Sequence, residues 1–294
     1  MELIWKQIEG YELLDSGEGR KLERIAGILV DRPSPQAIWR KKLSQAEWDK
    51  ASSVCLRTDD GGGKWKHKKG EPGETLIKWK PPFGKELQFK LRFTTFGHCG
   101  IFFEQECIWR FLNTRAKEIQ DKLGRPAKFI NLFAYTGGAS LSMAITGAEV
   151  FHVDSAKGIL NWARDWGVLN SIPEKNLRIV HEDARQFLKH SIKKGFLYDG
   201  ILLDPPSWGH GKEKEVWNFN DELQSLIDDC QKVIQPENAF VLLTSHTHGV
   251  QHQALKNVLH ASGKFSEVSV GELGVLHKND PRILPAGIYA LAER

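Results

Sequence analysis

The stretch Phe129-Ile-Asn-Leu-Phe-Ala-Tyr-Thr-Gly-Gly138 decides the fold of most of this 294-residue chain. Its first five residues form a short, mostly apolar run. The paired glycines behind the run allow the backbone to approach a ligand closely before a helix begins. An ordinary tight turn between a strand and a helix would also accept two glycines. The spacing is not G-x-G-x-x-G, so the pyrophosphate cradle of a dinucleotide site is incomplete.

Four more short apolar runs follow this one, and each successive start leaves room for one crossover helix. Alternation of this kind predicts right-handed βαβ units and a buried, largely parallel sheet. Such sheets bind ligands at the carboxyl ends of their strands, so we expect the chemistry in the loops behind the runs. A helix is also expected before the first run, over 104–122. The four later runs are 150–153, 177–180, 200–203 and 239–243.

The first hundred residues have a different pattern, in which period-two apolar runs alternate with Gly- and Pro-rich turns. We therefore predict two domains, a small β-rich domain over 1–100 and an α/β domain over 101–294. The expected β-runs are 25–30, 36–39, 75–79 and 87–93.

Positive charge is concentrated in this first part, which has 19 basic and 14 acidic residues, whereas the whole chain has a net charge of +4. A basic stretch with interleaved tryptophans suits a polyanion such as RNA, although a solvated loop would also explain it. The lysines expected to contact RNA are Lys64, Lys66, Lys68 and Lys69, together with Lys212 in a later loop.

The overall composition excludes several classes of protein. Hydrophobic residues make up 40% of the chain and charged residues 27%, which excludes a disordered chain. No run approaches the roughly 20 apolar residues that span a bilayer, and the N-terminus lacks a secretory apolar stretch. The four cysteines form no CxxC pair. We therefore expect a cytoplasmic protein without disulfides or a zinc ribbon.

Acidic residues stand behind the second and third runs. Asp154, followed by Ser155, could accept hydrogen bonds from both hydroxyls of a ribose. Asp183, followed by Ala184, could contact an adenine amino group. Each aspartate would equally well be the N-cap of the next helix, so neither is decisive alone.

The end of the fourth run is more specific, because Asp204-Pro-Pro-Ser-Trp208 combines an acid, two prolines and an aromatic residue. Pro205 and Pro206 keep the backbone extended and leave carbonyl groups free to bind a planar amine or amide edge. Trp208 could stack on the same ring. A structural turn rarely needs this combination, so we favour a functional role.

These motifs, in this order, resemble the class I S-adenosylmethionine (SAM)-dependent methyltransferases. The Phe-x-Tyr-Thr-Gly and Asp-Pro-Pro-x-aromatic forms are similar to those of bacterial large-subunit ribosomal RNA methyltransferases, a group with cytosine-C5 and guanine-N7 members. Gly100-Ile-Phe-Phe-Glu-Gln105 resembles the element that precedes the first strand there, with Glu104 in place of an aspartate. The resemblance implies a Rossmann-like, mostly parallel sheet with an antiparallel strand at 284–292 and its hairpin partner at 266–270.

The resemblance also implies SAM as cofactor and gives each site residue a role. Gln105 would touch substrate or cofactor, although on its own it could simply cap the helix that follows. The residues bordering the methionine part of SAM would be Tyr135, Thr136, Gly137 and Gly138; those near its ribose Asp154 and Ser155; those near its adenine Asp183 and Ala184; and those facing the acceptor base Asp204, Pro205, Pro206 and Trp208, with Asp204 also bordering the cofactor.

The acceptor atom is expected to be a nitrogen. Transfer to cytosine C5 usually employs a cysteine nucleophile, and no cysteine lies beside Asp204-Pro-Pro-Ser-Trp208. The fifth run is followed by His246, His248 and His252, a spacing that suggests zinc, but no fourth ligand is at hand. We expect a polar loop facing the substrate and no metal.

The predicted function is therefore SAM-dependent methyl transfer to RNA, with a base of ribosomal RNA as substrate. Alternatives are the same fold acting on DNA, protein or a small molecule, a nicotinamide-dependent oxidoreductase, and a catalytically silent RNA-binding relative. The missing glycine fingerprint disfavours the oxidoreductase. Intact Gly137, Asp154 and Asp204 disfavour the silent relative. Pairing into a homodimer is left open.

Overall fold

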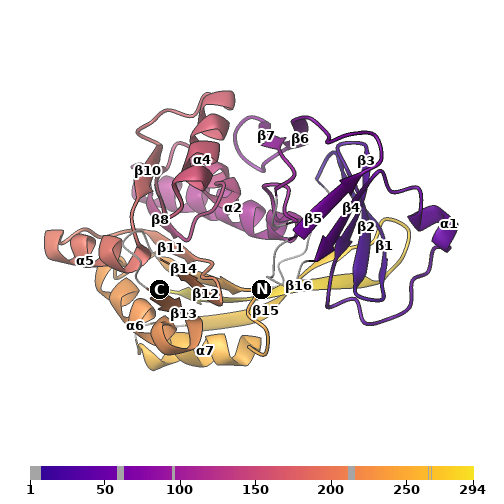
Figure 1. Cartoon of the computed structure of the whole chain (residues 1–294). Helices are drawn as coiled ribbons and strands as arrows, with labels where there is room; N and C mark the ends of the chain where they lie inside the picture. The colour runs from indigo at the N-terminus through magenta and orange to yellow at the C-terminus, as the bar shows by residue number, and fades with distance from the viewer. Residues whose placement is uncertain (1–7, 58–62, 95–96, 211–215, 264, 266) are drawn as a thin grey trace.

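The central sheet of the computed structural model has seven strands in the order β10-β9-β8-β11-β14-β16-β15 (Figure 1). The structure describes residues 8–57, 63–94, 97–210, 216–263, 265 and 267–294. The first five strands in this order are parallel, β16 runs antiparallel to β14, and β15 runs antiparallel to β16. The strands are β8 (Lys128–Leu132), β9 (Glu149–Asp154), β10 (Leu177–His181), β11 (Gly200–Leu203), β14 (Phe240–Ser245), β15 (Glu267–Leu276) and β16 (Ile283–Glu293).

This arrangement confirms the predicted α/β fold with its mostly parallel, Rossmann-like sheet. All five predicted apolar runs lie in parallel strands, because strands covered by helices on both faces need apolar residues throughout. Every residue of β11 and β14 is buried. The antiparallel strand expected at 284–292 lies within β16, and β15 is its hairpin partner.

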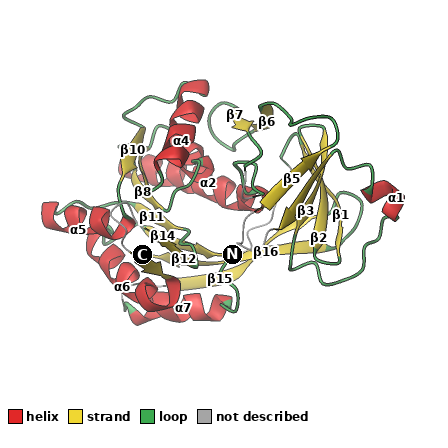
Figure 2. Ribbon diagram, in the orientation of Figure 1, coloured by secondary structure: helices red, strands yellow, loops and turns green. Residues whose placement is uncertain are grey.

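Helices cover both faces of the sheet (Figure 2). One face packs against α2 (Glu106–Leu123), α3 (Gly138–Ala144) and α4 (Lys157–Leu169), and the other against α5 (Ala184–Lys194), α6 (Phe219–Val233) and α7 (His252–Ala261). The helix expected over 104–122 is a 3₁₀ turn, Phe103–Gln105, continued by α2. In the described part of the chain, no helix is long and apolar enough to cross a membrane.

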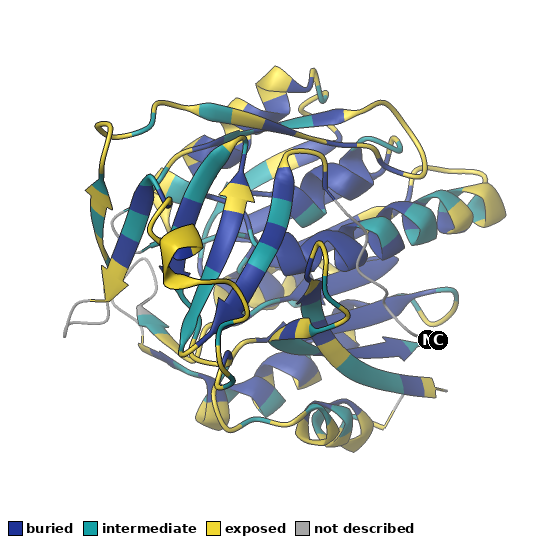
Figure 3. Ribbon diagram, turned by 90° about the vertical axis from the view of Figure 1, so that its right-hand side faces the viewer, coloured by how far each residue is buried: buried dark blue, intermediate teal, exposed yellow. Residues whose placement is uncertain are grey.

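A second sheet of five strands precedes this fold, in the order β1-β2-β3-β4-β5. Its pairs are antiparallel except for β3 with β4, as expected for a small β-rich region. Figure 3 shows buried and more exposed residues alternating along its strands. Its elements are β1 (Tyr11–Gly17), β2 (Arg20–Ile25), β3 (Ile28–Pro33), α1 (Gln45–Trp48), β4 (Ser53–Arg57) and β5 (Gly63–His67).

Two of the β-runs expected in this region were wrong. The run 25–30 is interrupted by a two-residue turn at Ala26 and Gly27, whose φ angles of 47° and 84° are both positive, as in a tight hairpin between twisted strands. The run 36–39 is a loop, because its carbonyl groups accept hydrogen bonds from the turn between β1 and β2 instead of from a strand. The donors are the backbone N–H groups of Glu18 and Gly19.

The hairpin of β6 (Thr75–Trp79) and β7 (Leu87–Leu91) matches the other two expected runs, but it packs against the α/β fold. The Lys90 carbonyl accepts hydrogen bonds from the indole N–H groups of Trp162 and Trp166 on α4, at 2.9 and 3.0 Å. One hydrophobic core continues from the N-terminal sheet through this hairpin to α2 and α4. The division at residue 100 remains a prediction.

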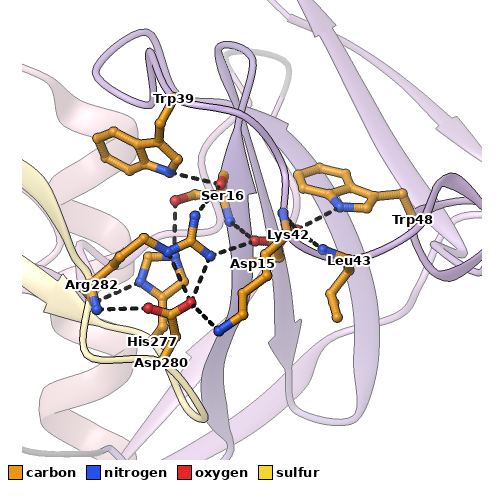
Figure 4. Close-up of polar contacts among 9 residues, drawn as sticks. All are labelled: Asp15, Ser16, Trp39, Lys42, Leu43, Trp48, His277, Asp280 and Arg282. Carbon is orange, nitrogen blue, oxygen red and sulfur yellow. Dashed lines mark hydrogen bonds and ion pairs between the residues drawn. The ribbon is translucent and has the colours of Figure 1, made fainter.

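The tip of the β15–β16 hairpin extends beyond the central sheet (Figure 1) and lies beside β1 (Figure 4). Asp15 is fully buried there, and its carboxylate accepts hydrogen bonds from the Arg282 guanidinium at 3.0 Å and the Trp48 indole at 3.0 Å. His277, 2% exposed, bonds the Ser16 hydroxyl through Nε2 at 2.8 Å. We call this cluster the junction; it comprises Asp15, Ser16, Trp39, Lys42, Leu43, Trp48, His277, Asp280 and Arg282.

Candidate active site

The loop between β8 and α3 has an unusual backbone. Phe133, Tyr135 and Gly137 all have positive φ angles, of 55°, 53° and 103°. A Cβ atom on Gly138 would lie 2.3 Å from the Trp109 ring, so no larger residue fits there without displacing the indole. Non-glycine residues in this conformation cost free energy and tend to occur at functional sites. This loop and the first residue of α3 together carry four of the predicted cofactor residues.

A chain of hydrogen bonds that runs through His152 on β9 fixes the conformation of the β8–α3 loop. Burial lowers the pKa of His152 to about 4, so its imidazole is neutral and has one donor and one acceptor nitrogen. Because the Tyr135 carbonyl can only accept, Nε2–H of His152 donates to it, at 3.0 Å. Nδ1 then accepts from the Ser140 hydroxyl at 2.8 Å, and Ser140 accepts from the Asn131 amide at 2.9 Å. The sequence did not indicate this relay.

Thr136 is also held in place, by a hydrogen bond to the segment that precedes α2. It is 2% exposed, and its hydroxyl donates to the Gly100 carbonyl at 2.6 Å. Gly100 has a φ of 91°, and a Cβ atom there would lie 2.3 Å from Trp162. The motif that precedes α2 is therefore packed directly against the β8–α3 loop.

Asp154 ends β9 beside this loop. Its carboxylate accepts from the backbone N–H of Tyr135 at 3.0 Å and of Ala156 at 2.8 Å. The N-cap of α4 is Ala156, so the alternative that Asp154 caps the helix was wrong. Burial raises the pKa of Asp154 and outweighs its hydrogen bonds, which lower it. A buried carboxylate whose loss of hydration is not fully offset by its hydrogen bonds is stabilised by additional hydrogen-bond donors.

Asp183 is the N-cap of α5, as its alternative interpretation proposed. Its carboxylate accepts from the backbone N–H groups of Arg185 and Gln186 and is paired with the Arg185 guanidinium at 3.1 Å. Ala184 is the first, buried residue of the helix. Next to Asp154, the carbonyl of Ser155 is bonded to the imidazole of His181 at 3.0 Å. A role for these residues toward adenine or ribose remains a prediction.

Asp204 lies at the carboxyl end of β11 and lines a cavity of about 70 Å³ together with the β8–α3 loop. We call this the inner cavity; its other lining residues include Phe102, Gln105, Trp109, Tyr135 and Gly137. Gln105 is the N-cap residue of α2, as its alternative interpretation proposed, although its side chain makes no cap hydrogen bond. Its amide lies 3.4 Å from the Asp204 carboxylate. This contact brings the side chains of Gln105 and Asp204 together, while a role of Gln105 toward substrate or cofactor remains a prediction.

His246, in the loop after β14, is the second neighbour of Asp204. Its Nε2 lies 3.7 Å from the Asp204 carboxylate, while Nδ1–H donates to the Ala286 carbonyl at 2.5 Å. Burial lowers the pKa of His246, but the negative charges of Asp204 and Glu104 and the bond to Ala286 outweigh it and raise the pKa above 6.5. The imidazole is therefore held in one orientation with Nε2 toward the carboxylate.

The prolines and the tryptophan behind Asp204 lead to the protein surface. Pro205 is buried, and the carbonyl of Pro206 accepts from the Trp217 indole at 2.6 Å. Trp208 is 58% exposed and begins β12 (Trp208–His210), which pairs with β13 (Val216–Asn218). Lys212 lies outside the described residues.

A larger cleft of about 480 Å³ lies between the N-terminal sheet and the loop of His246. We call this the outer cleft. Ile101 and Phe102 line both the inner cavity and the outer cleft, so the two adjoin. The described residues that line the outer cleft include Lys21, Arg32 and Arg57. Arg32 is neutralised by buried Glu23, through bonds of 2.6 and 2.9 Å.

The predicted RNA-binding lysines lie on the edge strand β5 and just after it. Lys64, Lys66, Lys68 and Lys69 are exposed. Trp65 points the other way: its indole donates to the Thr94 carbonyl at 2.7 Å, and one ring face stacks on His67. The lysines are thus accessible, while the ring between them is packed into the protein.

The three histidines do not gather around one point. Within the described ranges there is no group of three or more His, Cys, Asp and Glu side chains that could hold a metal ion. His246 faces Asp204, whereas His252 begins α7. The sequence predicted that His246 lies in a polar loop facing the substrate, but it did not predict that His246 is a neighbour of Asp204.

A family model described as S-adenosylmethionine-dependent methyltransferase matches residues 57–230, more than half of the chain. The chain belongs to this family. A solved SAM-dependent methyltransferase from Agrobacterium tumefaciens is 32% identical, with a TM-score of 0.89 over 98% of this chain and 91% of that one. A Streptococcus mutans structure, described as a SAM-dependent methyltransferase, is 15% identical, with a TM-score of 0.71 over 98% and 76%. The second likeness shows the fold alone.

Among curated relatives of this methyltransferase-family chain is the ribosomal RNA large subunit methyltransferase K/L of Shewanella sp. (strain MR-4). It is 33% identical over 157 residues, which cover 52% of this chain and 21% of the relative. The matched segment is thus about a fifth of the length of that protein.

The residues at the carboxyl ends of β8, β9 and β11 fit the cofactor of this family. Gly137 and Gly138 both line the inner cavity, and a side chain on Gly138 would displace Trp109, which lines the same cavity. Asp154, under-compensated beside the same loop, can accept more hydrogen bonds. A small polar ligand with hydroxyl groups satisfies both features.

Proposed function

We propose that this chain transfers a methyl group from SAM to a nitrogen atom of an RNA base, in the large-subunit ribosomal RNA. The observation that carries the proposal is the position of Asp204. Asp204 borders the inner cavity, which Tyr135 and Gly137 also line, and its carboxylate lies 3.7 Å from His246, which lines the outer cleft. A donor and an acceptor that enter from these two sides would meet at Asp204.

In this proposal the cofactor is held mainly by backbone and carboxylate groups. Tyr135, Thr136, Gly137 and Gly138 border its methionine part; Asp154 with Ser155 holds the ribose; Asp183 with Ala184 faces the adenine. SAM supplies an electrophilic methyl group. The chain's own task is to hold the acceptor nitrogen in line with that methyl group, so catalysis rests on proximity and orientation. Asp204, Pro205, Pro206 and Trp208 orient the acceptor base.

The cysteines support nitrogen over cytosine C5 as the acceptor. Cys55, Cys99, Cys107 and Cys230 are all buried. Burial raises the pKa of each of these thiols, that of Cys107 to about 12. A thiol, unlike a thiolate, is a poor nucleophile. A mechanism that needs a covalent cysteine adduct is therefore disfavoured.

RNA as substrate is supported by charge and by the relatives' printed names. We propose that the region 1–100 binds RNA, with Lys64, Lys66, Lys68, Lys69 and Lys212 contacting phosphates. A cytoplasmic location and the pairing of two copies belong to the same proposal; the free thiols fit a reducing compartment. Salt should weaken the binding, because each lysine that contacts a phosphate releases counterions.

The test is transfer of a labelled methyl group from SAM to unmodified large-subunit ribosomal RNA made by transcription, followed by nucleoside analysis of the labelled base. Labelled RNA with a methylated nitrogen supports the proposal. A 5-methylcytosine product would overturn the proposal that the acceptor is a nitrogen. Label that enters DNA or protein but not RNA would overturn the proposal that RNA is the substrate. Thermal melting with S-adenosylhomocysteine (SAH) and separately with NAD tests the cofactor, since a shift with NAD alone would indicate a dehydrogenase.

A further inference from the structure

We propose that His246 accepts the proton that the acceptor nitrogen loses as it is methylated. The proposal rests on the proposed function, in which a base nitrogen that carries hydrogen receives the methyl group. The new bond forms between nitrogen and the methyl carbon, while the bond from that carbon to sulfur breaks and its electron pair stays on sulfur. The N–H proton then passes to Nε2 of His246, which becomes an imidazolium beside the Asp204 carboxylate.

The position of His246 supports this role. Its ring lines the outer cleft, through which the acceptor would enter, and its Nε2 lies within 3.7 Å of the carboxylate that borders the inner cavity. The Phe102 ring, which lines both spaces, is stacked on the imidazole with centroids 5.9 Å apart. A base that moves from the outer cleft toward the inner cavity would therefore lie close to His246.

The hydrogen bonds of His246 also suit a proton acceptor. Because the Ala286 carbonyl can only accept, Nδ1 carries the hydrogen of the neutral ring and Nε2 presents its lone pair. The amide of Gln105 lies 3.4 Å from both Nε2 and the Asp204 carboxylate. Gln105 is thus a common neighbour of His246 and Asp204 at the point where the inner cavity and the outer cleft adjoin.

The other titratable groups at this point are less suitable. Tyr135 and Asp204 line the inner cavity. Burial raises the pKa of Tyr135, so its phenol stays protonated and cannot accept a proton. A carboxylate is in general a weaker base than an imidazole. Asp204 is better suited to orient the acceptor and to stabilise the imidazolium, as the carboxylate beside a catalytic histidine does.

Among the described residues, the titratable groups Asp204, Glu104 and His98 interact electrostatically with His246. Asp204 approaches from the end of β11 and Glu104 from the 3₁₀ turn, and both raise the pKa of His246. His98 is the third; burial lowers its own pKa to about 4, so it is neutral at physiological pH. The neutral form of His246 is the one that accepts a proton. Methyl transfer should therefore rise with pH and level off above the pKa of His246.

The test compares wild-type protein with His246→Asn. The Asn amide can take the place of Nδ1–H at the Ala286 carbonyl but has no basic nitrogen in place of Nε2. We expect kcat/KM on transcribed ribosomal RNA to fall about 100-fold, the lower end for loss of a general base. We also expect the pH inflection to disappear and SAH affinity to stay unchanged. His260→Asn, on the exposed end of α7, is the matched control.

A second measurement does not depend on activity. The His246 ring protons are titrated by NMR in wild-type protein and in Asp204→Asn, and the midpoint should move to lower pH in the variant because a negative charge is removed. Wild-type transfer rate and inflection in His246→Asn would overturn the proposal, as would a midpoint that does not respond to Asp204→Asn. Failure of wild-type protein to methylate RNA would instead overturn the proposed function.

Discussion

Two sets of aspartates can be compared in this molecule, one at the junction and one at the candidate active site. At the junction, Asp15 accepts hydrogen bonds from three backbone N–H groups, an indole and a guanidinium. At the site, Asp154 accepts from two backbone N–H groups, and Asp204 has Gln105 at 3.4 Å and His246 at 3.7 Å.

The pKa shifts express the same difference. Burial raises the pKa of Asp15, but its hydrogen bonds to Leu43, Trp48, Arg282 and Lys42 outweigh burial, and the pKa is lowered. For Asp154 burial prevails, and the pKa is raised. A carboxylate that stabilises the fold has its acceptor sites filled from within the protein. One that binds a ligand keeps some of them for the ligand.

The largest expected effect is that of Asp204→Asn on methyl transfer. Loss of the carboxylate removes both the orientation of the acceptor and the partner of His246, so transfer should fall about 100- to 1000-fold. The unfolding free energy should change by less than about 0.5 kcal/mol, because the carboxylate makes only long contacts. Rates measured with labelled SAM, alongside urea unfolding, test both statements. A marked loss of stability in Asp204→Asn would instead show that Asp204, like Asp15, stabilises the fold.

Asp15→Ala should have the opposite consequence. Removal of this carboxylate leaves buried N–H groups and the Arg282 guanidinium without their acceptor, at a cost of about 3 kcal/mol of stability. Urea unfolding measures the loss, and isothermal titration should find SAH affinity unchanged in the folded protein. Asp121→Ala, on the exposed face of α2, is the control. If Asp15→Ala matched this control, the junction would contribute little to stability.

Asp154→Asn should abolish most of the stabilisation by SAH. At 100 times its dissociation constant, SAH stabilises the wild-type protein by about 2.7 kcal/mol. The variant loses an acceptor for the ribose hydroxyls, and the rise of its melting temperature with SAH should largely vanish. Asp165→Asn, on the exposed side of α4, should respond like wild type. An undiminished response of Asp154→Asn would remove it from the cofactor site.

The smallest effect is a difference of sign in the pH dependence of stability without ligand. The stabilisation that depends on the lowered pKa of Asp15 is present above its ordinary pKa of 3.8 and is lost as pH falls through the lower folded value. The raised pKa of Asp154 does the reverse: its penalty is absent below 3.8 and grows as pH rises from there to the folded value. Asp154→Asn should therefore be slightly more stable than wild type at pH 7, and Asp15→Asn less stable. Unfolding free energies measured from pH 7 down to about pH 2 test this.

The sequence predicted the central sheet well, because the signals were local. Each parallel strand is a continuous apolar run, and Gly137, Asp154 and Asp204 stand directly behind such runs. Where the fold depends on turn conformation, prediction failed. Ala26-Gly27 adopts positive φ angles like the more familiar Asn-Gly turn, but alanine gives no sign of it.

The site was only partly predictable, because its supporting contacts join distant parts of the chain. Asp204 and Gln105 could be named from their motifs. His246 reaches them across 141 residues from Gln105, and the relay through Asn131, Ser140 and His152 joins a strand, a helix and a neighbouring strand. Motifs indicate candidate residues for contact with a ligand. They do not report those that fix the orientation of these residues.

The position of Arg282 at the junction has a consequence for synthesis of the protein on the ribosome. Its carboxylate partner, Asp15, is translated 267 residues earlier. The local partners of Asp15, at Lys42, Leu43 and Trp48, emerge soon after it, but the guanidinium arrives only when the β15–β16 hairpin has been made. Contacts so distant in sequence are slow to form and leave intermediates exposed. The first sheet should therefore reach its final protection against proteolysis only after the last strands of the central sheet have folded.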